Sequence, residues 1–122
     1  MIQVVIIDDN KPIRDMIREE LESHPDIRVV GEADDGLVGC QIAVSLRPDI
    51  VVMDMSLGRL DGISATKRLV AQVPDICIIG VSAFGDDQTE RTMLAAGATA
   101  FVRKEVIGQA LVDCIRKVLA SH

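Results

Sequence analysis

The chain has 122 residues and a formal net charge of -6, which fit a single domain and oppose direct binding to the phosphates of nucleic acid. Hydrophobic residues make up 48% of the chain, but Trp and Tyr are absent and only two Phe occur, so the core must be aliphatic. Cys40, Cys77 and Cys114 form no C-x-x-C pair, which argues against a zinc site and a disulfide framework and indicates buried thiols.

Apolar runs and amphipathic stretches alternate through the first half of the chain. Gln3 to Ile7 is a nearly continuous apolar run, typical of a strand buried on both faces, and it stops at Asp8 and Asp9. A helix is predicted from Pro12, which suits a first helical turn, to His24-Pro25. After it come a predicted strand, Ile27 to Ala33, a turn at residues 34–36, and a predicted helix, Leu37 to Leu46.

The second half continues the alternation after a break at Arg47-Pro48-Asp49. The predicted strand Ile50 to Met53 is followed by a helix that begins at Asp61, a residue suited to an N-cap, and ends before Pro74. Gly97 stands where a left-handed helix end is expected. The other predicted elements are the strand Ile76 to Val81, a helix up to Ala96, the strand Ala100 to Val102 and the last helix, Val106 to Leu119.

Five strands alternating with five helices predict a doubly wound α/β fold, with a parallel sheet covered on both faces. Residues 1–122 are expected to form one domain.

Polar residues follow four of these strands at their carboxyl ends: Asp8 and Asp9, Asp54, Ser82, and Lys104. Such ends face one crevice in an open parallel sheet, so the side chains are expected to converge. Three carboxylates repel one another unless a cation joins them, and oxygen ligands without His or Cys favour Mg²⁺. Lys104 and Ser82 would suit the oxygens of a phosphoryl group. Asp54 is the candidate reactive residue; taken alone, it could equally cap the next segment.

In this order, the residues resemble the receiver domain of bacterial response regulators over nearly the whole chain. The resemblance rests on the Asp8-Asp9 pair, Asp54 before Asp61-Gly62, Ser82-Ala83, Gly97-Ala98, Phe101 and Lys104. The stretch VVGEADDG at 29–36 and the D-x-x-L-G-x-x-D-G loop most resemble the NarL/FixJ subgroup. The resemblance implies a CheY-like (flavodoxin-like) sheet with strand order 2-1-3-4-5 in a two-component phosphorelay protein.

The resemblance also implies a phosphoacceptor and a metal site. Asp54 would take a phosphoryl group from a sensor histidine kinase and form an aspartyl phosphate. Asp9 and Asp54 would ligate Mg²⁺, or Mn²⁺, directly. Asp8 would bind it through water, and the backbone carbonyl of Ser56 would complete the protein ligands.

Other side chains would bind the phosphate, report it or modulate its lifetime. Ser82 would hydrogen-bond the phosphoryl group, Lys104 would pair with it, and Phe101 would report the movement of Ser82. By periodicity alone, however, Phe101 is a plain core residue. Phe84 and Ser56 flank the approach of a hydrolytic water, so slow self-dephosphorylation is expected. The alternative is that Phe84 folds away onto its loop.

Two residues depart from the family pattern. Gly58 stands where the family usually has Pro, which should loosen the loop because Gly admits more backbone states. Glu105 follows Lys104 where many members have Pro, so the peptide between them is expected to be trans, since a cis bond without Pro costs about 2.5 to 4 kcal/mol.

We therefore expect a phosphorylatable switch and no enzyme beyond its own phosphorylation and dephosphorylation. Its output would be transcription, through a downstream helix-turn-helix domain, or protein contacts of a free-standing receiver. A haloacid-dehalogenase-type phosphatase needs a second Asp where Ser56 stands, and a pseudo-receiver would not need all five polar positions. A flavodoxin-like cofactor binder would need a phosphate loop after the first strand, and none is present.

The last predicted helix carries a broad apolar arc and is expected to support a homodimer or partner surface. The arc consists of Ile107, Ala110, Leu111, Cys114, Ile115 and Val118. Val112 and Leu119 lie beyond its margin and are expected to be exposed; the alternative is that they are isolated exposed residues of no consequence. No apolar run approaches the roughly 18 residues of a membrane span, so a cytoplasmic location without membrane contact is expected.

Overall fold

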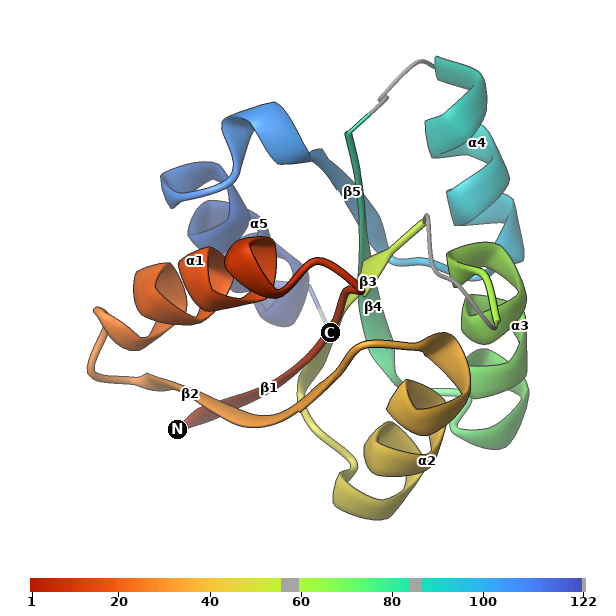
Figure 1. Cartoon of the computed structure of the whole chain (residues 1–122), viewed down its shortest axis with the longest axis horizontal. Coiled ribbons are helices and arrows are strands. Elements are labelled where there is room, and N and C mark those ends of the chain that lie inside the picture. The colour runs from red at the N-terminus through yellow and green to blue at the C-terminus, as the bar shows by residue number, and fades with distance from the viewer. Residues whose placement is uncertain (56–59, 84–86, 122) are drawn as a thin grey trace.

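A single parallel sheet forms the centre of the computed structural model, which describes residues 1–55, 60–83 and 87–121 (Figure 1). Its strands are β1 (Ile2–Ile7), β2 (Ile27–Ala33), β3 (Ile50–Asp54), β4 (Cys77–Ser82) and β5 (Ala100–Arg103). The strand order is β2-β1-β3-β4-β5, as the family resemblance implied. The helices are α1 (Lys11–Glu22), α2 (Gly36–Leu46), α3 (Gly62–Gln72), α4 (Asp87–Ala96), α5 (Gln109–Ala120) and the short 3₁₀ turn η1 (Lys104–Val106).

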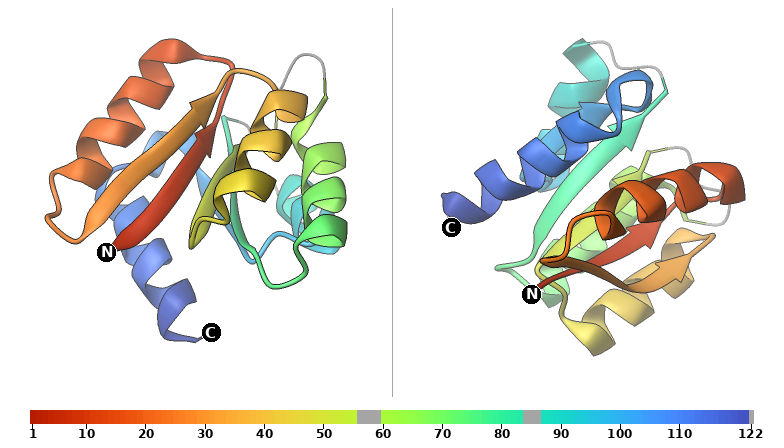
Figure 2. Two further views of the ribbon diagram at one scale, coloured as in Figure 1. Left: turned by 90° about the horizontal axis from the view of Figure 1, so that it is seen from below. Right: turned by 90° about the vertical axis from the view of Figure 1, so that its left-hand side faces the viewer.

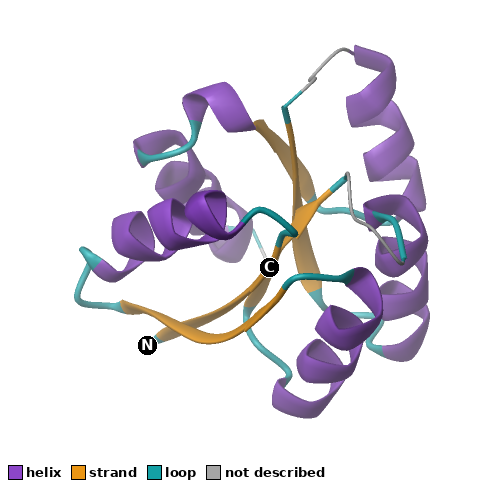
Figure 3. Ribbon diagram, viewed as in Figure 1, coloured by secondary structure: helices purple, strands orange, loops and turns teal. Residues whose placement is uncertain are grey.

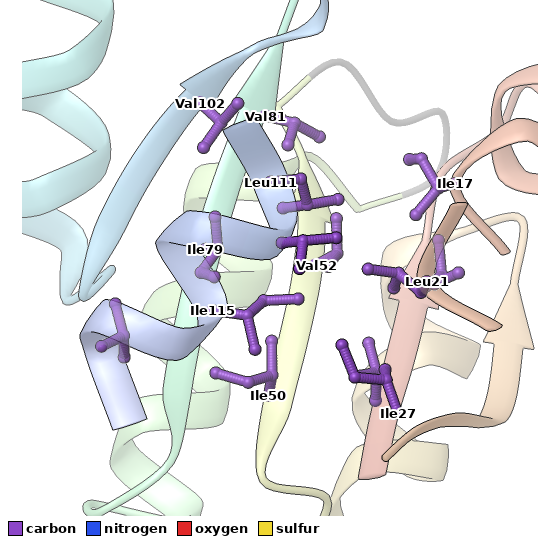
Figure 4. Close-up of a cluster of buried hydrophobic side chains, with 14 of the residues drawn as sticks. Ile17, Leu21, Ile27, Ile50, Val52, Ile79, Val81, Val102, Leu111 and Ile115 are labelled. Atoms are coloured by element: carbon purple, nitrogen blue, oxygen red, sulfur yellow. The ribbon is translucent and has the colours of Figure 1, made fainter. Parts of the chain in front are cut away.

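The helices cover both faces of the sheet, with α1 and α5 on one side and α2, α3 and α4 on the other (Figures 2 and 3). Alternate residues of the strands supply the two cores, because side chains alternate between the faces. Ile50, Val52 and Ile79 meet Leu111 and Ile115 of α5 on the first side (Figure 4). The strands β3 and β4 are buried along their whole length, as expected for central parallel strands.

Local capping fixes where the chain enters the helices at the carboxyl edge of the sheet and where it leaves α4 at the opposite edge. Asn10 caps α1 through a 3.1 Å hydrogen bond that its side chain accepts from the N–H of Ile13. Asp61 accepts a 2.8 Å hydrogen bond from the N–H of Ser64, which confirms its predicted role as the N-cap of α3. After α4, Gly97 has a φ of 118°, so the chain turns at the predicted glycine.

The predicted last helix is wrong at its start and in its exposed margin. Residues 104–106 form η1, and Gly108, with a φ of 94°, separates this turn from α5. Val112, expected to be exposed, is fully buried, and Leu119 is half-buried. The reason is that α5 contacts both the sheet and α1, so a wide apolar arc is covered.

Two smaller expectations can be compared with the structure. Cys40 and Cys77 are buried thiols as predicted, whereas Cys114 is only half-buried. The peptide between Lys104 and Glu105 is trans, as expected, since no cis bond occurs in the described residues. In the same part of the chain, no helix has the length and apolar character needed to cross a membrane.

Candidate functional site

The ends of β1, β3 and β5 bring two aspartates and a lysine into contact at the carboxyl edge of the sheet. Asp8 follows β1, Asp54 is the last residue of β3, and Lys104 opens η1 directly after β5. The Nζ atom of Lys104 lies 3.0 Å from Oδ2 of Asp8 and 3.1 Å from Oδ1 of Asp54. The predicted convergence of these strand-end residues is therefore present in the structure.

Burial makes this contact electrostatically strong. Asp8 and Asp54 are both buried, so their carboxylates are poorly screened by water. Burial of Lys104 by itself lowers its pKa, but contact with Asp8 and the charge of Asp54 outweigh this effect and raise the pKa of Lys104 above its ordinary value. Lys104 thus remains a cation beside the two carboxylates.

The third acid, Asp9, completes a set of carboxylates suited to a metal ion. One oxygen each from Asp8, Asp9 and Asp54 lies within 4.8 Å of the others. Asp9 is exposed while the other two are buried, so the set is open to solvent on one side. Three hard oxygen donors with an open side fit Mg²⁺, which retains several waters when it binds to protein.

The predicted phosphate-binding hydroxyl and switch aromatic lie on the two strands beyond β3. Ser82 is the last residue of β4 and is buried, one residue past Val81, which pairs with Asp54 in the sheet. Phe101 is half-buried in β5 opposite Gly80. A Cβ atom on Gly80 would lie 2.6 Å from the side chain of Met93 and 3.4 Å from the ring of Phe101, so this glycine makes room for both.

Three residues that entered the sequence predictions lie outside the described residues. They are Ser56, Gly58 and Phe84. The expected carbonyl ligand, the loosened loop and the slow self-dephosphorylation therefore stay predictions.

Gly62 contributes to the site in a way that the sequence analysis did not identify. Its N–H donates a 3.1 Å hydrogen bond to the carbonyl of Met55, and a Cβ atom added to it would lie 2.1 Å from the carbonyl oxygen of Asp54. Only glycine allows the start of α3 to pack so closely on the end of β3. The signal was the glycine directly after the capping Asp61.

Arg14 is a second residue that the sequence analysis missed. Its Nη1 atom donates a 2.7 Å hydrogen bond to the backbone carbonyl of Asp8. No sequence pattern identifies this contact, because an arginine on a surface helix is normally expected to be exposed to solvent.

Comparison with known proteins agrees with this arrangement. A family model described as the response regulator receiver domain matches residues 4–116. The chain is 39% identical over 116 residues to the transcriptional regulatory protein LiaR of Bacillus subtilis (strain 168). The aligned region covers 95% of this chain and 55% of LiaR. It is 38% identical over 109 residues to a protein-glutamate methylesterase/protein-glutamine glutaminase of Syntrophus aciditrophicus (strain SB), which covers 88% of this chain and 31% of that protein.

A solved structure shares both the fold and part of the sequence. The crystal structure of a LuxR-family two-component response regulator from Aurantimonas sp. SI85-9A1 has a TM-score of 0.93 and 28% identity, over 98% of this chain and 86% of that one. The chain spans about half the length of LiaR and less of the methylesterase. The predicted family resemblance is confirmed by these matches.

Proposed function

Because the chain belongs to the response regulator receiver family, we propose that Asp54 accepts a phosphoryl group from a sensor histidine kinase. The observation that carries this proposal is the position of Asp54. It is buried at the end of the central strand β3 and pairs with Lys104, which also contacts Asp8. A carboxylate held in this way has a cation beside the point where an incoming phosphoryl group would add negative charge.

The transfer forms one bond and breaks one bond. A carboxylate oxygen of Asp54 attacks the phosphorus atom, and the bond between phosphorus and the donor breaks with its electron pair leaving on the donor; from acetyl phosphate the leaving group is acetate. Lys104 balances charge on the oxygens that are carried across. Asp8, Asp9 and Asp54 would hold Mg²⁺, which supplies charge neutralisation for the anionic donor.

Residues of β4 and β5 would respond to the new phosphate. Ser82 ends the strand next to β3, so its hydroxyl is the proposed donor to the phosphoryl group. Phe101 pairs with Gly80 on the same strand, two residues before Ser82, and is the proposed reporter of the movement of Ser82. The ring is half-buried and packs close to Gly80.

The proposed output is the control of transcription through a helix-turn-helix domain, which similarity to transcriptional regulators such as LiaR supports. Contacts of a free-standing receiver are the alternative. We propose no catalytic activity for this chain beyond the chemistry of Asp54. The cytoplasm is the proposed location, since the donor is a kinase of the two-component type.

A homodimer through α5 stays a prediction. Fewer apolar side chains are exposed on this helix than the sequence analysis expected. Val112 belongs to the core, and the exposed apolar residues at this helix include Val106, just before it, and Ala110. Light scattering with and without beryllofluoride, on the wild type and on Val106→Lys, would test it.

The experiment for the main proposal is incubation with acetyl phosphate, followed by intact mass measurement. The wild type should gain the mass of one phosphate in the presence of Mg²⁺ and none with excess EDTA. Asp54→Asn should gain none, whereas Asp26→Asn, which alters an exposed aspartate in an ion pair far from the site, should behave as the wild type. Equal labelling of Asp54→Asn would overturn the proposal.

A further inference from the structure

Arg14 holds the backbone of the segment that carries both Asp8 and Asp9. Strand β1 ends at Ile7, and although the N–H of Asp8 still bonds to the carbonyl of Ala33 at 3.1 Å, the chain leaves the sheet here. The carbonyl of Asp8 accepts its hydrogen bond from Nη1 of Arg14, at 2.7 Å. A hydrogen bond from a charged donor at this length is among the stronger ones in proteins.

The guanidinium of Arg14 is itself held in place from its other side. Its Nε atom lies 3.5 Å from Oε1 of Glu32 on the edge strand β2, and the other carboxylate oxygen of Glu32 pairs with Arg18. The side chains of Arg14 and Glu32 are only 15% and 17% exposed. The guanidinium thus makes a hydrogen bond to a strand end through Nη1 and an ion pair, without a hydrogen bond from Nε, to the neighbouring strand. A lysine, with a single ammonium group, matches this spread of donors less well.

The peptide group that Arg14 holds joins Asp8 to Asp9, so its orientation sets the direction in which Asp9 leaves the backbone. The Asp8 carboxylate has other supports, a 2.9 Å hydrogen bond from the N–H of Asn10 and the contact with Lys104. The carboxylate of Asp9 is exposed, and across residues 1–55, 60–83 and 87–121 no hydrogen bond or ion pair fixes it. Its place in the carboxylate set therefore depends on the backbone.

We propose that Arg14 is a positioning residue for the metal site, which directs Asp9 toward Asp8 and Asp54 by holding the peptide between residues 8 and 9. This inference rests on the proposed function, since it assumes that the three carboxylates bind Mg²⁺. Glu32 holds Arg14 in the required orientation. Side chains that orient metal ligands without touching the metal typically affect metal affinity by about 10 to 100-fold.

The competing explanation is that Arg14 only ties α1 to β2. Arg18 provides a matched control, because it pairs with the same Glu32 but makes no contact with Asp8. A purely structural role would make Arg14→Ala and Arg18→Ala equivalent for metal binding, with differences confined to stability.

The experiment is a calorimetric titration of Mg²⁺ into the folded chain, without any phosphoryl donor. Arg14→Ala should weaken Mg²⁺ binding by about tenfold, Arg14→Lys should recover part of the affinity by donating to the Asp8 carbonyl, and Arg18→Ala should bind as the wild type. If Arg14→Ala does not fold, the comparison of Mg²⁺ affinity between Arg14→Lys and Arg18→Ala tests the proposal instead. Wild-type affinity in the folded Arg14 variants, or equal weakening in Arg18→Ala, would overturn the proposal.

Phosphorylation supplies an independent readout. With acetyl phosphate, Arg14→Ala should need about tenfold more Mg²⁺ for half-maximal rate, while its rate at saturating Mg²⁺ stays close to that of the wild type. If the wild type binds Mg²⁺ but takes up no phosphoryl group, the proposed function fails and the titrations still decide the role of Arg14. If the wild type binds no Mg²⁺, the inference about Arg14 is wrong, whatever the labelling experiment shows.

Discussion

At both ends of the sheet, aspartates contact a basic side chain, but one site is buried and the other is exposed to solvent. At the carboxyl edge, Lys104 contacts Asp8 and Asp54, with side chains that are 16%, 1% and 2% exposed. At the other end, Arg116 of α5 makes two hydrogen bonds to Asp26, at 2.7 and 3.1 Å, with side chains that are 42% and 52% exposed. The exposed pair is bidentate, since both carboxylate oxygens of Asp26 accept a hydrogen bond. Burial, however, determines how strongly the charges interact, because water screens the exposed pair.

The two sites also differ in charge balance. Arg116 and Asp26 neutralise each other, whereas the lysine at the carboxyl edge faces three acids, Asp8, Asp54 and the nearby Asp9. The exposed pair is complete by itself. The buried group retains an excess of negative charge, which is the property that a cation-dependent site requires.

Removing the buried cation should give the largest effect. Lys104→Met removes the cation beside two buried carboxylates, so we expect the free energy of unfolding in EDTA to fall by about 3 kcal/mol. Urea unfolding followed by circular dichroism would measure it. Arg116→Met, which breaks the exposed pair, should change the unfolding midpoint little. Equal losses in the two variants would contradict the distinction drawn from burial.

Adding Mg²⁺ should stabilise the wild type through the acids at the carboxyl edge, Asp8, Asp9 and Asp54, and not through the exposed pair. A ligand that binds only the folded state at 100 times its dissociation constant stabilises it by about 2.7 kcal/mol. Asp9→Asn should lose most of this gain, because it removes one of the three carboxylates. Asp26→Asn should keep all of it. Urea midpoints across a Mg²⁺ series would measure the effect, and a full gain in Asp9→Asn would exclude Asp9 from the metal set.

In the absence of metal, Asp9→Asn should increase the stability of the fold rather than decrease it. The substitution relieves repulsion from Asp8 and Asp54, whose oxygens lie within 4.8 Å, and we expect the free energy of unfolding to rise by about 1 kcal/mol. The gain should shrink at high salt, because Asp9 is exposed. A loss of stability in EDTA would show that the Asp9 carboxylate supports the apo fold.

The smallest effect should come from acid titration of the exposed pair. The hydrogen bond from Arg116 lowers the pKa of Asp26 from 3.8 to about 2, against the opposing effect of burial. Because the folded state lowers this pKa, the contribution of Asp26 to stability is present above about pH 4 and is lost as the pH falls toward 2. Carboxyl NMR titration should show the low pKa in the wild type and an ordinary one in Arg116→Gln.

The contribution of Lys104 should be lost at the other end of the pH scale. Its pKa is raised above 10.5 in the folded state, so its stabilising effect is present below that pH and is lost as the pH rises through the higher folded value. Unfolding midpoints of the wild type and Lys104→Met should therefore converge only in strong alkali. Convergence near neutral pH would mean that Lys104 is not held as a cation.

The sequence by itself determined the order of the elements and which strand ends carry the candidate site residues. Unbroken apolar runs such as Ile50 to Met53 mark buried parallel strands, and the acids and lysine directly after those runs must lie at one edge, because parallel strands share a direction. Capping at Asp61 and the turn at Gly97 were likewise predictable, since they depend on neighbouring residues.

Only the tertiary structure decided which side chains meet across the fold. The start of α5 after Gly108 and the burial of Val112 depend on how α1 and the sheet together enclose that helix, which helical periodicity cannot show. The same holds for Arg14. It joins the carbonyl of Asp8 to Glu32, residues that are close only after β1, α1 and β2 have packed. Local patterns predict elements because they act over a few residues, whereas these contacts depend on the distances between elements that folding creates.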